Sequence, residues 1–180
     1  MKEEELIRCC QQWHAKAQET VYELYADRLY RLVQRYVRDT AEAEEVLMNA
    51  FLKAFKHIQS FAYQSPGSFE GWLRKIVVNE SLMWLRRNHN FNLVESIDDT
   101  LPEPGLLPFS SMESDDIYHF ITQLPTGYRT VFNLFVVEGF DHAEIAAMLS
   151  ISEVTSRSQL FKAKAMLKKM LTQEGYHYGT

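Results

Sequence analysis

One proline-rich segment constrains the fold of this chain more than any other feature. Residues 100–114 read TLPEPGLLPFSSMES and contain three prolines, one glycine and three serines. Prolines lack an amide donor, and prolines, glycines and serines together disfavour regular structure. Because helical spacing lies on both sides of this segment, we predict two domains, 1–90 and 115–180, joined by a linker over 91–114.

The first domain has the apolar spacing of three long helices. Apolar residues recur at three- and four-residue steps over 21–37, over 46–58 and over 71–87. Asp39 and Thr40 precede the second run, where their side chains can accept the unpaired amide hydrogens of a helix start. Pro66 and Gly67 break the chain before the third run, and Ser68 is expected to cap the helix that follows.

The second domain is expected to hold four helices, over 115–123, 128–138, 142–149 and 153–171. Gly139 ends the second of these, Asp141 and Glu144 form a capping box for the third, and Ser152 caps the fourth. Long β-branched runs are nearly absent from the chain. The predicted class is therefore all-α, with two small helical domains, a flexible acidic linker and a helix-turn-helix in the second domain.

The acidity of the chain is concentrated around the linker. The formal net charge is −5, and residues 88–128 alone carry seven acids with no Lys or Arg. Both ends of the chain are consequently close to neutral. Overall charge therefore says little about what either domain binds.

Several function classes are excluded by residues that the chain lacks. Cys9 and Cys10 are the only cysteines and are adjacent, so we expect no disulfide framework and a cytoplasmic location. The acidic start and the lack of an apolar run of about 18 residues predict neither a signal peptide nor membrane insertion. The histidines stand at no metal-ligand spacing, and no phosphate loop or nucleophile elbow is present. We therefore predict no catalytic residue, no metal and no cofactor, and a protein that is not an enzyme.

Residues 142–170 have the layout of a helix-turn-helix: a short apolar helix, a three-residue turn and a longer basic helix. At 3.6 residues per turn, one side of the second helix is expected to be buried. This side comprises Ser156, Leu160, Ala163, Leu167 and Met170. The adjoining side forms a ridge, which we call the basic ridge, and Lys162 lies on its flank. The ridge comprises Arg157, Phe161, Lys164 and Lys168.

The basic ridge suits the major groove of DNA. Arg157 is the best candidate for a bidentate contact to guanine, Phe161 suits a thymine methyl group, and the lysines suit phosphates. The alternative is an ordinary amphipathic helix with solvated lysines and a locally packed Phe161. The preceding helix and turn favour the DNA interpretation.

The order of three motifs resembles the bacterial RNA polymerase sigma factors of the extracytoplasmic function (ECF) group. The motifs are AEEVLMNAFLKAF, SFEGWLRKIVVN and LPTGYRTVFNLFVVEGFDHAEIAAMLSISEVTSRSQLFKAKAML, and the resemblance runs from about Thr20 to Leu171. It implies a binding protein that brings core RNA polymerase to promoter DNA. The first domain would dock on the polymerase and open the downstream element, and the second would read the upstream element as duplex. Most of the group are held by an anti-sigma factor, which is a further implied partner.

The resemblance implies a polymerase-binding helix over 39–55. The residues carried over to this role are Glu44, Glu45, Met48, Asn49 and Lys53. Family members often have a Gln–Glu pair where this chain has Met48 and Asn49. This departure leaves open an alternative: a sigma-like helix-turn-helix regulator that binds DNA without recruiting polymerase.

For the downstream element, the resemblance implies a loop over 61–69 that captures a flipped base and a helix over 72–87 that follows the opened strand. The residues assigned here are Phe61, Tyr63, Ser65, Ser68, Lys75, Asn79, Arg86 and Arg87. Phe61 has a second interpretation, in which its ring closes the core. We expect Phe69 and Trp72 in the core.

For the upstream element, the resemblance places five residues of the last helix on DNA: Arg157, Ser158, Phe161, Lys162 and Lys164. Ser156 stands where the family has an apolar residue, and Val154 where it often has glycine. We expect the Ser156 hydroxyl to bond back to a carbonyl one turn earlier. Val154 is expected to supply the missing apolar contact.

Overall fold

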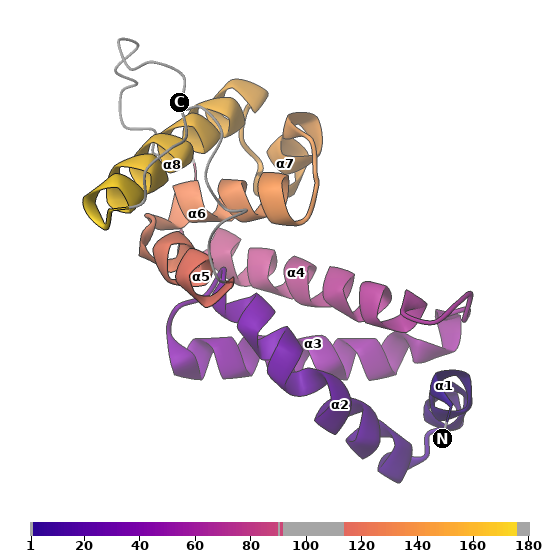
Figure 1. Ribbon diagram of the computed structural model, residues 1–180. Coiled ribbons are helices and arrows are strands. Elements are labelled where there is room, and N and C mark those ends of the chain that lie inside the picture. Colours follow the sequence, from indigo (N-terminus) through magenta and orange to yellow (C-terminus); the bar gives the residue numbers. More distant parts are fainter. Residues whose placement is uncertain (1, 90, 92–113, 176–180) are drawn as a thin grey trace. The chain divides into compact units, whose positions relative to one another are not determined.

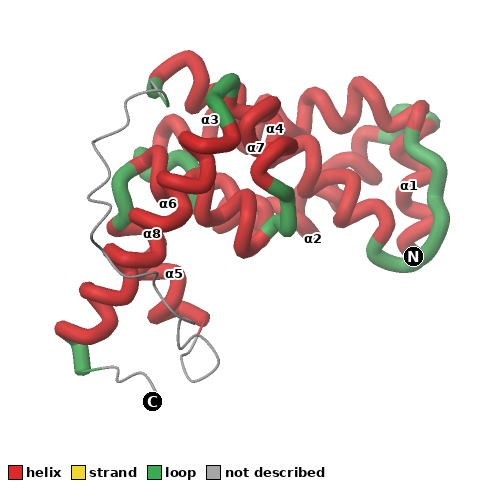
Figure 2. The backbone as a smooth tube through the Cα atoms, turned by 90° about the horizontal axis from the view of Figure 1, so that it is seen from above, coloured by secondary structure: helices red, strands yellow, loops and turns green. Residues whose placement is uncertain are grey.

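A computed structural model of the chain describes residues 2–89, 91 and 114–175 (Figure 1). Within these ranges the chain forms helices joined by loops and has no strand, as Figure 2 shows by colour. The predicted all-α class is thereby confirmed. The chain divides into two compact units, Met1–Arg87 and Asn88–Thr180. The linker predicted over 91–114 lies, except for Phe91 and Ser114, outside the described residues.

The first unit is built from four α-helices and one 3₁₀ turn. These are α1 (Glu3–Gln11), α2 (Ala15–Gln34), α3 (Thr40–His57), the turn Ile58–Ser60 and α4 (Ser68–Asn88). α2 packs against both α1 and α3, and α1 also packs against the 3₁₀ turn. The core of this unit comes from the predicted apolar stripes, including Val33, Phe51 and Leu73.

Two side-chain contacts join α3 to α4. The Lys53 Nζ lies 2.6 Å from Oε1 of Glu80, whose side chain is buried. The Trp84 indole donates to Oε2 of Glu42 at 2.8 Å. These two polar contacts therefore hold α4 to α3.

The predicted helix starts of the first unit differ in outcome. Asp39 precedes α3 and accepts a hydrogen bond from the Glu42 amide at 3.0 Å, which confirms it as a cap. The prediction that the Ser68 side chain caps the following helix is wrong. Ser68 is the first residue of α4, and its hydroxyl accepts from the amides of Gln64 and Ser65 at 3.4 Å. The hydroxyl thus closes the loop that precedes the helix.

The second unit contains α5 (Ser114–Gln123), α6 (Thr126–Phe132), a π-helical turn (Asn133–Val137), α7 (His142–Leu149) and α8 (Glu153–Gln173). The helix predicted over 128–138 corresponds to α6 and the π-helical turn. Gly139 follows at φ 79°, a left-handed conformation that glycine adopts without strain.

Local capping fixes the helix-turn-helix of the second unit. Asp141 accepts from the Glu144 amide at 2.8 Å, and the Glu144 carboxylate accepts from the Asp141 amide, which completes the predicted capping box. Ser150 ends α7 in the left-handed conformation, at φ 56°. Ser152 then caps α8 by accepting from the Thr155 amide at 3.0 Å.

α8 packs against both α6 and α7 and carries much of the core of its unit. Its buried side chains include Leu160, Ala163 and Leu167, as the helical spacing predicts, while Met170 is half-buried. None of the helices in the described ranges is long and apolar enough to cross a membrane.

Candidate nucleic-acid interfaces

The basic ridge begins at Arg157, in the first turns of α8. Arg157 is exposed, and its Nη2 lies 2.6 Å from Oε2 of Glu153, one turn earlier. Exposed ion pairs of this kind contribute at most about 1 kcal/mol, so a better acceptor can displace Glu153. The Arg157 guanidinium can therefore leave Glu153 for an acceptor in a DNA groove.

The rest of the basic ridge follows at three- and four-residue steps. Phe161 and Lys164 are half-buried, and Lys168 is exposed. On the flank, the Lys162 ammonium lies 5.9 Å from the ring centroid of Tyr128, within the range of a cation–π contact. The structure thus places all the predicted cations of α8 at least partly in solvent, along one continuous helix.

Ser158 is the exception among the residues assigned to the upstream element. Its side chain is only 7% exposed, and its hydroxyl has no hydrogen-bond partner among the described residues. On either side of it along the chain, Ser156 contacts His142 on α7 and Gln159 lies against Gly127 on α6, so α8 is covered by both helices here. The structure contradicts the placement of Ser158 on the exposed DNA-facing side.

Ser156 has a different partner from the one expected. Its hydroxyl lies 2.8 Å from Nδ1 of His142, the first residue of α7. The expected bond to a carbonyl one turn earlier is wrong because the side chain joins the two helices of the helix-turn-helix instead. Val154 does not supply the missing apolar contact either, since it is 68% exposed.

His142 is a site residue that sequence reasoning missed. Its ring stacks on Phe135, with centroids 4.6 Å apart. Burial, followed by the nearby Arg157 guanidinium, holds the pKa of His142 below its usual value. The neutral ring therefore prevails near pH 7, which suits a hydrogen bond with the Ser156 hydroxyl. The available signal was the polar Ser156 on a side of α8 that must be buried.

α3 presents a mixed acidic and apolar surface. Glu44, Glu45 and Asn49 are exposed, and Met48 and Leu52 are 50% and 61% exposed. Sequence reasoning missed Leu52, which had been assigned no role. Glu45, Met48 and Leu52 lie at steps of three and four residues, so they share one side of the helix. We call this set the α3 face.

Lys53 points elsewhere. Its ammonium is engaged with the buried carboxylate of Glu80 on α4. An ammonium held in this way stabilises the first unit, so we leave it out of the α3 face.

The loop over 61–67 combines one buried ring with an exposed polar stretch. Phe61 is only 9% exposed and packs in a cluster, with its ring centroid 5.3 Å from that of Phe69 and 5.1 Å from that of Trp72. The interpretation in which Phe61 closes the core is therefore favoured, and Phe69 is buried as expected.

The polar residues of the loop lie nearer the solvent. Tyr63 is half-buried and Ser65 is exposed. Burial and the Glu3 carboxylate raise the pKa of the Tyr63 hydroxyl, which keeps it a hydrogen-bond donor.

α4 carries an exposed polar row downstream of this loop. Lys75, Asn79 and Arg86 are exposed, and the last two follow Lys75 by four and eleven residues. At 3.6 residues per turn these three share one side of the helix, and the exposed Arg87 lies on the next side.

Across residues 2–89, 91 and 114–175, no three or more His, Cys, Asp or Glu side chains are grouped so that they could hold a metal ion.

Two separate units, one with a capped helix-turn-helix and one with an exposed polar helix row, define the class of a helical DNA-binding protein. Family comparison then matches residues 21–91 to sigma-70 region 2 and residues 114–167 to sigma-70 region 4. Together the two matches cover well over half of the chain. The chain belongs to the sigma-70 family.

Similar proteins place the chain in the ECF group of that family and confirm the resemblance inferred from the sequence. It is 29% identical to ECF RNA polymerase sigma factor SigE of Mycolicibacterium smegmatis, over 83% of this chain and 59% of SigE. The chain thus spans less than two thirds of that relative. It is 27% identical to ECF RNA polymerase sigma factor SigW of Bacillus subtilis, over 84% of this chain and 87% of SigW. For the ECF RNA polymerase sigma-E factor of Haemophilus influenzae the identity is 28%, over 95% and 96% of the two chains.

A solved structure shares the fold. It is entitled "Structure of CnrH in complex with the cytosolic domain of CnrY", and the match has a TM-score of 0.51 at 19% sequence identity. The match covers 94% of this chain and 97% of the other.

Proposed function

We propose that the chain binds core RNA polymerase and directs it to promoters, with the first unit at the downstream element and the second at the upstream element. The observation that carries this proposal is that region 2 and region 4 matches occur together, in order, on two units with DNA-suited surfaces. The alternative, a regulator that does not recruit polymerase, finds no support among the relatives, which are named as RNA polymerase sigma factors.

The α3 face is the proposed polymerase-docking surface, with Glu44 and Asn49 beside it. Met48 and Leu52 would be buried on docking, and a large apolar side chain gains about 1.5–3 kcal/mol when it is fully removed from water. The carboxylates of Glu44 and Glu45 would meet a basic surface of the polymerase. Apolar contact at Met48 would thus take the place of the polar pair that many family members have.

The downstream element would be bound by the loop and by α4. A flipped base needs a pocket with apolar walls and a few polar groups that read its edge. Tyr63 and Ser65 are the loop residues that can supply such groups, with Ser68 holding the loop closed. Four residues of α4 would follow the opened strand, the cations on phosphates and the amide on a base: Lys75, Asn79, Arg86 and Arg87.

The upstream element would be read as duplex by α8. Arg157 and Phe161 lie nearest the start of the helix, where major-groove readers contact base edges. Lys162, Lys164 and Lys168 would pair with phosphates, which adds affinity without sequence information. Ser158 is left out of this surface because it is buried.

Transcription in vitro tests this function. The chain and core polymerase are incubated with a promoter library, and we expect transcripts only from promoters that carry both elements. A variant with Met48→Ala and Leu52→Ala should lose the complex with core polymerase, because the apolar contact of the α3 face is gone. Leu24→Ala is the matched control, since Leu24 is an exposed leucine on α2. Absence of a complex between the unaltered chain and core polymerase at low salt would contradict the proposal.

Sigma factors as a class are not enzymes, and their polymerase and promoters lie in the cytoplasm, where we place this chain.

We also propose an anti-sigma partner that covers the α3 face. The solved structure of CnrH in complex with the cytosolic domain of CnrY supports a partner of this kind. Competition between such a partner and core polymerase for the chain is the test, and simultaneous binding of both would contradict it.

A further inference from the structure

α1 holds the N-terminal end of the loop over 61–67. The Gln11 side-chain amide donates to the carbonyl of Ile58 at 3.1 Å and to the carbonyl of Phe61 at 2.9 Å. The Gln59 side-chain amide donates in turn to the Gln11 carbonyl. Gln11 thus fixes the point where the 3₁₀ turn passes into the loop.

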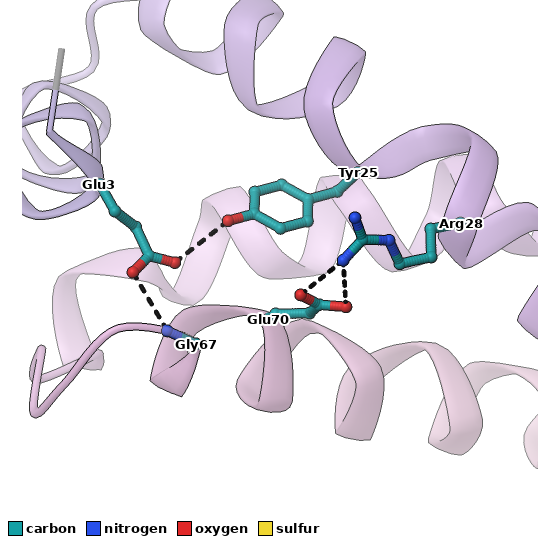
Figure 3. A network of polar contacts seen from close by, with 5 residues as sticks. All are labelled: Glu3, Tyr25, Arg28, Gly67 and Glu70. Carbon is teal, nitrogen blue, oxygen red and sulfur yellow. Dashed lines mark hydrogen bonds and ion pairs between the residues drawn. The ribbon is translucent and has the colours of Figure 1, made fainter.

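The same helix also holds the other end of the loop. One carboxylate oxygen of Glu3 accepts from the amide of Gly67 at 3.2 Å, and the other accepts from the hydroxyl of Tyr25 at 3.1 Å (Figure 3). Gly67 has φ 85° and directly precedes α4, so its amide is one of the donors that a helix start leaves unpaired. A carboxylate at this position also complements the positive end of the helix dipole.

Two residues of α2, Tyr25 and Arg28, also help to hold Glu3 and the start of α4 beside the loop. Arg28 Nη1 donates to both carboxylate oxygens of Glu70 at 2.8 Å, which joins α2 to the first turn of α4 (Figure 3). Burial and the hydrogen bond to Glu3 raise the pKa of Tyr25 to about 12, so its hydroxyl remains a donor at neutral pH. The Tyr25 hydroxyl therefore holds the Glu3 carboxylate in place.

The loop itself has few internal contacts, chiefly those of the Ser68 hydroxyl, which accepts from the amides of Gln64 and Ser65 at 3.4 Å. Ala62, Gln64, Ser65 and Pro66 are exposed, and only Tyr63 among the residues between Phe61 and Gly67 is half-buried. A surface stretch with so little packing depends for its conformation on these two bonds and on its anchored ends. A site that reads a base must be held to within about 0.5 Å by the residues around it.

We propose that α1 is a brace for the base-reading loop, and that Glu3 and Gln11 are positioning residues that determine its base preference. This inference rests on the proposed role of the loop at the downstream element. α1 lies ahead of residues 21–91, which match sigma-70 region 2, so the brace is additional to the matched region. The two residues act on DNA through the loop and make no contact with the base.

The test uses the full chain with core polymerase on promoter fragments whose downstream element is already opened by mismatches. Each position of that element is varied through the four bases, and the readout is the ratio of binding to the best and the worst base. Glu3→Ala and Gln11→Ala should each lower this ratio about threefold to tenfold, the equivalent of one lost hydrogen bond. Binding to the upstream duplex should not change.

Matched controls come from the same segment of the chain. Glu5 lies in the first turn of α1 and Gln12 directly follows its last residue, and both are exposed, so Glu5→Ala and Gln12→Ala should leave the ratio unchanged. Glu3→Gln keeps one carbonyl oxygen as an acceptor and should retain more discrimination than Glu3→Ala. If Glu3→Ala unfolds the first unit, Glu3→Gln and Gln11→Ala still decide the question.

Loop variants separate this inference from the proposed function. If Tyr63→Ala and Ser65→Ala alter the base ratio while the α1 variants do not, the brace is wrong and the loop still reads the base. A uniform loss of binding to all four bases in the α1 variants would also overturn the brace. If the loop variants too leave the ratio unchanged, the proposed reading role of the loop itself fails.

Discussion

The two surfaces proposed to meet promoter DNA are built in opposite ways. The helix-turn-helix is fixed by local contacts: the Asp141–Glu144 capping box, the Ser152 cap, and the His142–Ser156 bond between residues 14 apart. The loop over 61–67 is fixed by contacts from α1 across 50 and 64 residues. Local sequence can therefore specify the upstream reader almost alone, whereas the downstream reader depends on the folding of the whole first unit.

The largest expected effect is a loss of stability when the ion pair between Lys53 on α3 and Glu80 on α4 is broken. Lys53→Ala should lower the free energy of unfolding by about 2–3 kcal/mol, because it leaves the buried Glu80 carboxylate without its partner. Urea unfolding measures this loss. Arg8→Ala is the control, since Arg8 pairs with Glu4 within the same helix, on an exposed surface, and should cost less than about 1 kcal/mol. Equal costs for the two variants would contradict the contrast between long-range and local contacts.

Arg157→Ala should weaken binding to the cognate upstream duplex by about 1–3 kcal/mol and relax selectivity at one base pair. A gel-shift series over single-base variants of the element measures both quantities. The base ratio at the opened downstream element should stay unchanged, because the two readers are built separately. Glu153→Ala serves as the control and should not weaken binding, since Glu153 only holds Arg157 in the free chain. Wild-type affinity in Arg157→Ala would show that α8 does not enter the groove as proposed.

Ser156→Ala tests the local contact within the helix-turn-helix. The loss of its hydrogen bond to His142 should lower the stability of the second unit by about 1 kcal/mol. Because the bond joins these two residues directly, Ser156→Ala combined with His142→Ala should cost less than the sum of the two single changes. Strictly additive costs in urea unfolding would show that the pair is not coupled.

Lys168→Ala should have a smaller and less specific effect. Lys168 is exposed on the basic ridge, where the proposed partner is a phosphate. Its loss should weaken binding evenly across upstream sequences and lower the slope of log affinity against log salt by about one unit. Titrations at several salt concentrations measure this slope. An unchanged slope would place Lys168 away from the DNA backbone.

The smallest expected effect is a pH dependence of the stability of the second unit. Burial lowers the pKa of both His89 and His142, and the cations Arg129 and Arg157 add to these shifts. Around His142, Lys164 also disfavours the proton, while Glu153 and Asp141 favour it. The unfolded chain therefore takes up protons at a higher pH than the folded chain does. Stability should be full above about pH 6.5 and should decline as the pH falls below that value.

Urea unfolding at pH 7.5 and at pH 5.5 measures this decline. Removing both imidazoles with His89→Ala and His142→Ala should reduce the difference between the two pH values. An undiminished difference in the double variant would assign the pH dependence to other groups.

The sequence by itself determined the three long helices of the first unit, the helix-turn-helix of the second and the family, but not α1. Asp39, Asp141 and Ser152 were predicted as caps and are confirmed, because capping depends on residues within one turn. The two-domain helical class followed from apolar spacing and from the proline-rich segment, both of which are local signals.

Tertiary structure alone decided where several side chains point. Ser158 is buried where α6 lies against Gln159 and α7 against Ser156, and Lys53 pairs with Glu80 on another helix. Spacing along one helix gives the side that a residue occupies but not which neighbours cover that side. The partner of Ser156 and the brace on the loop depend on contacts between elements, and a periodic pattern carries no record of such contacts.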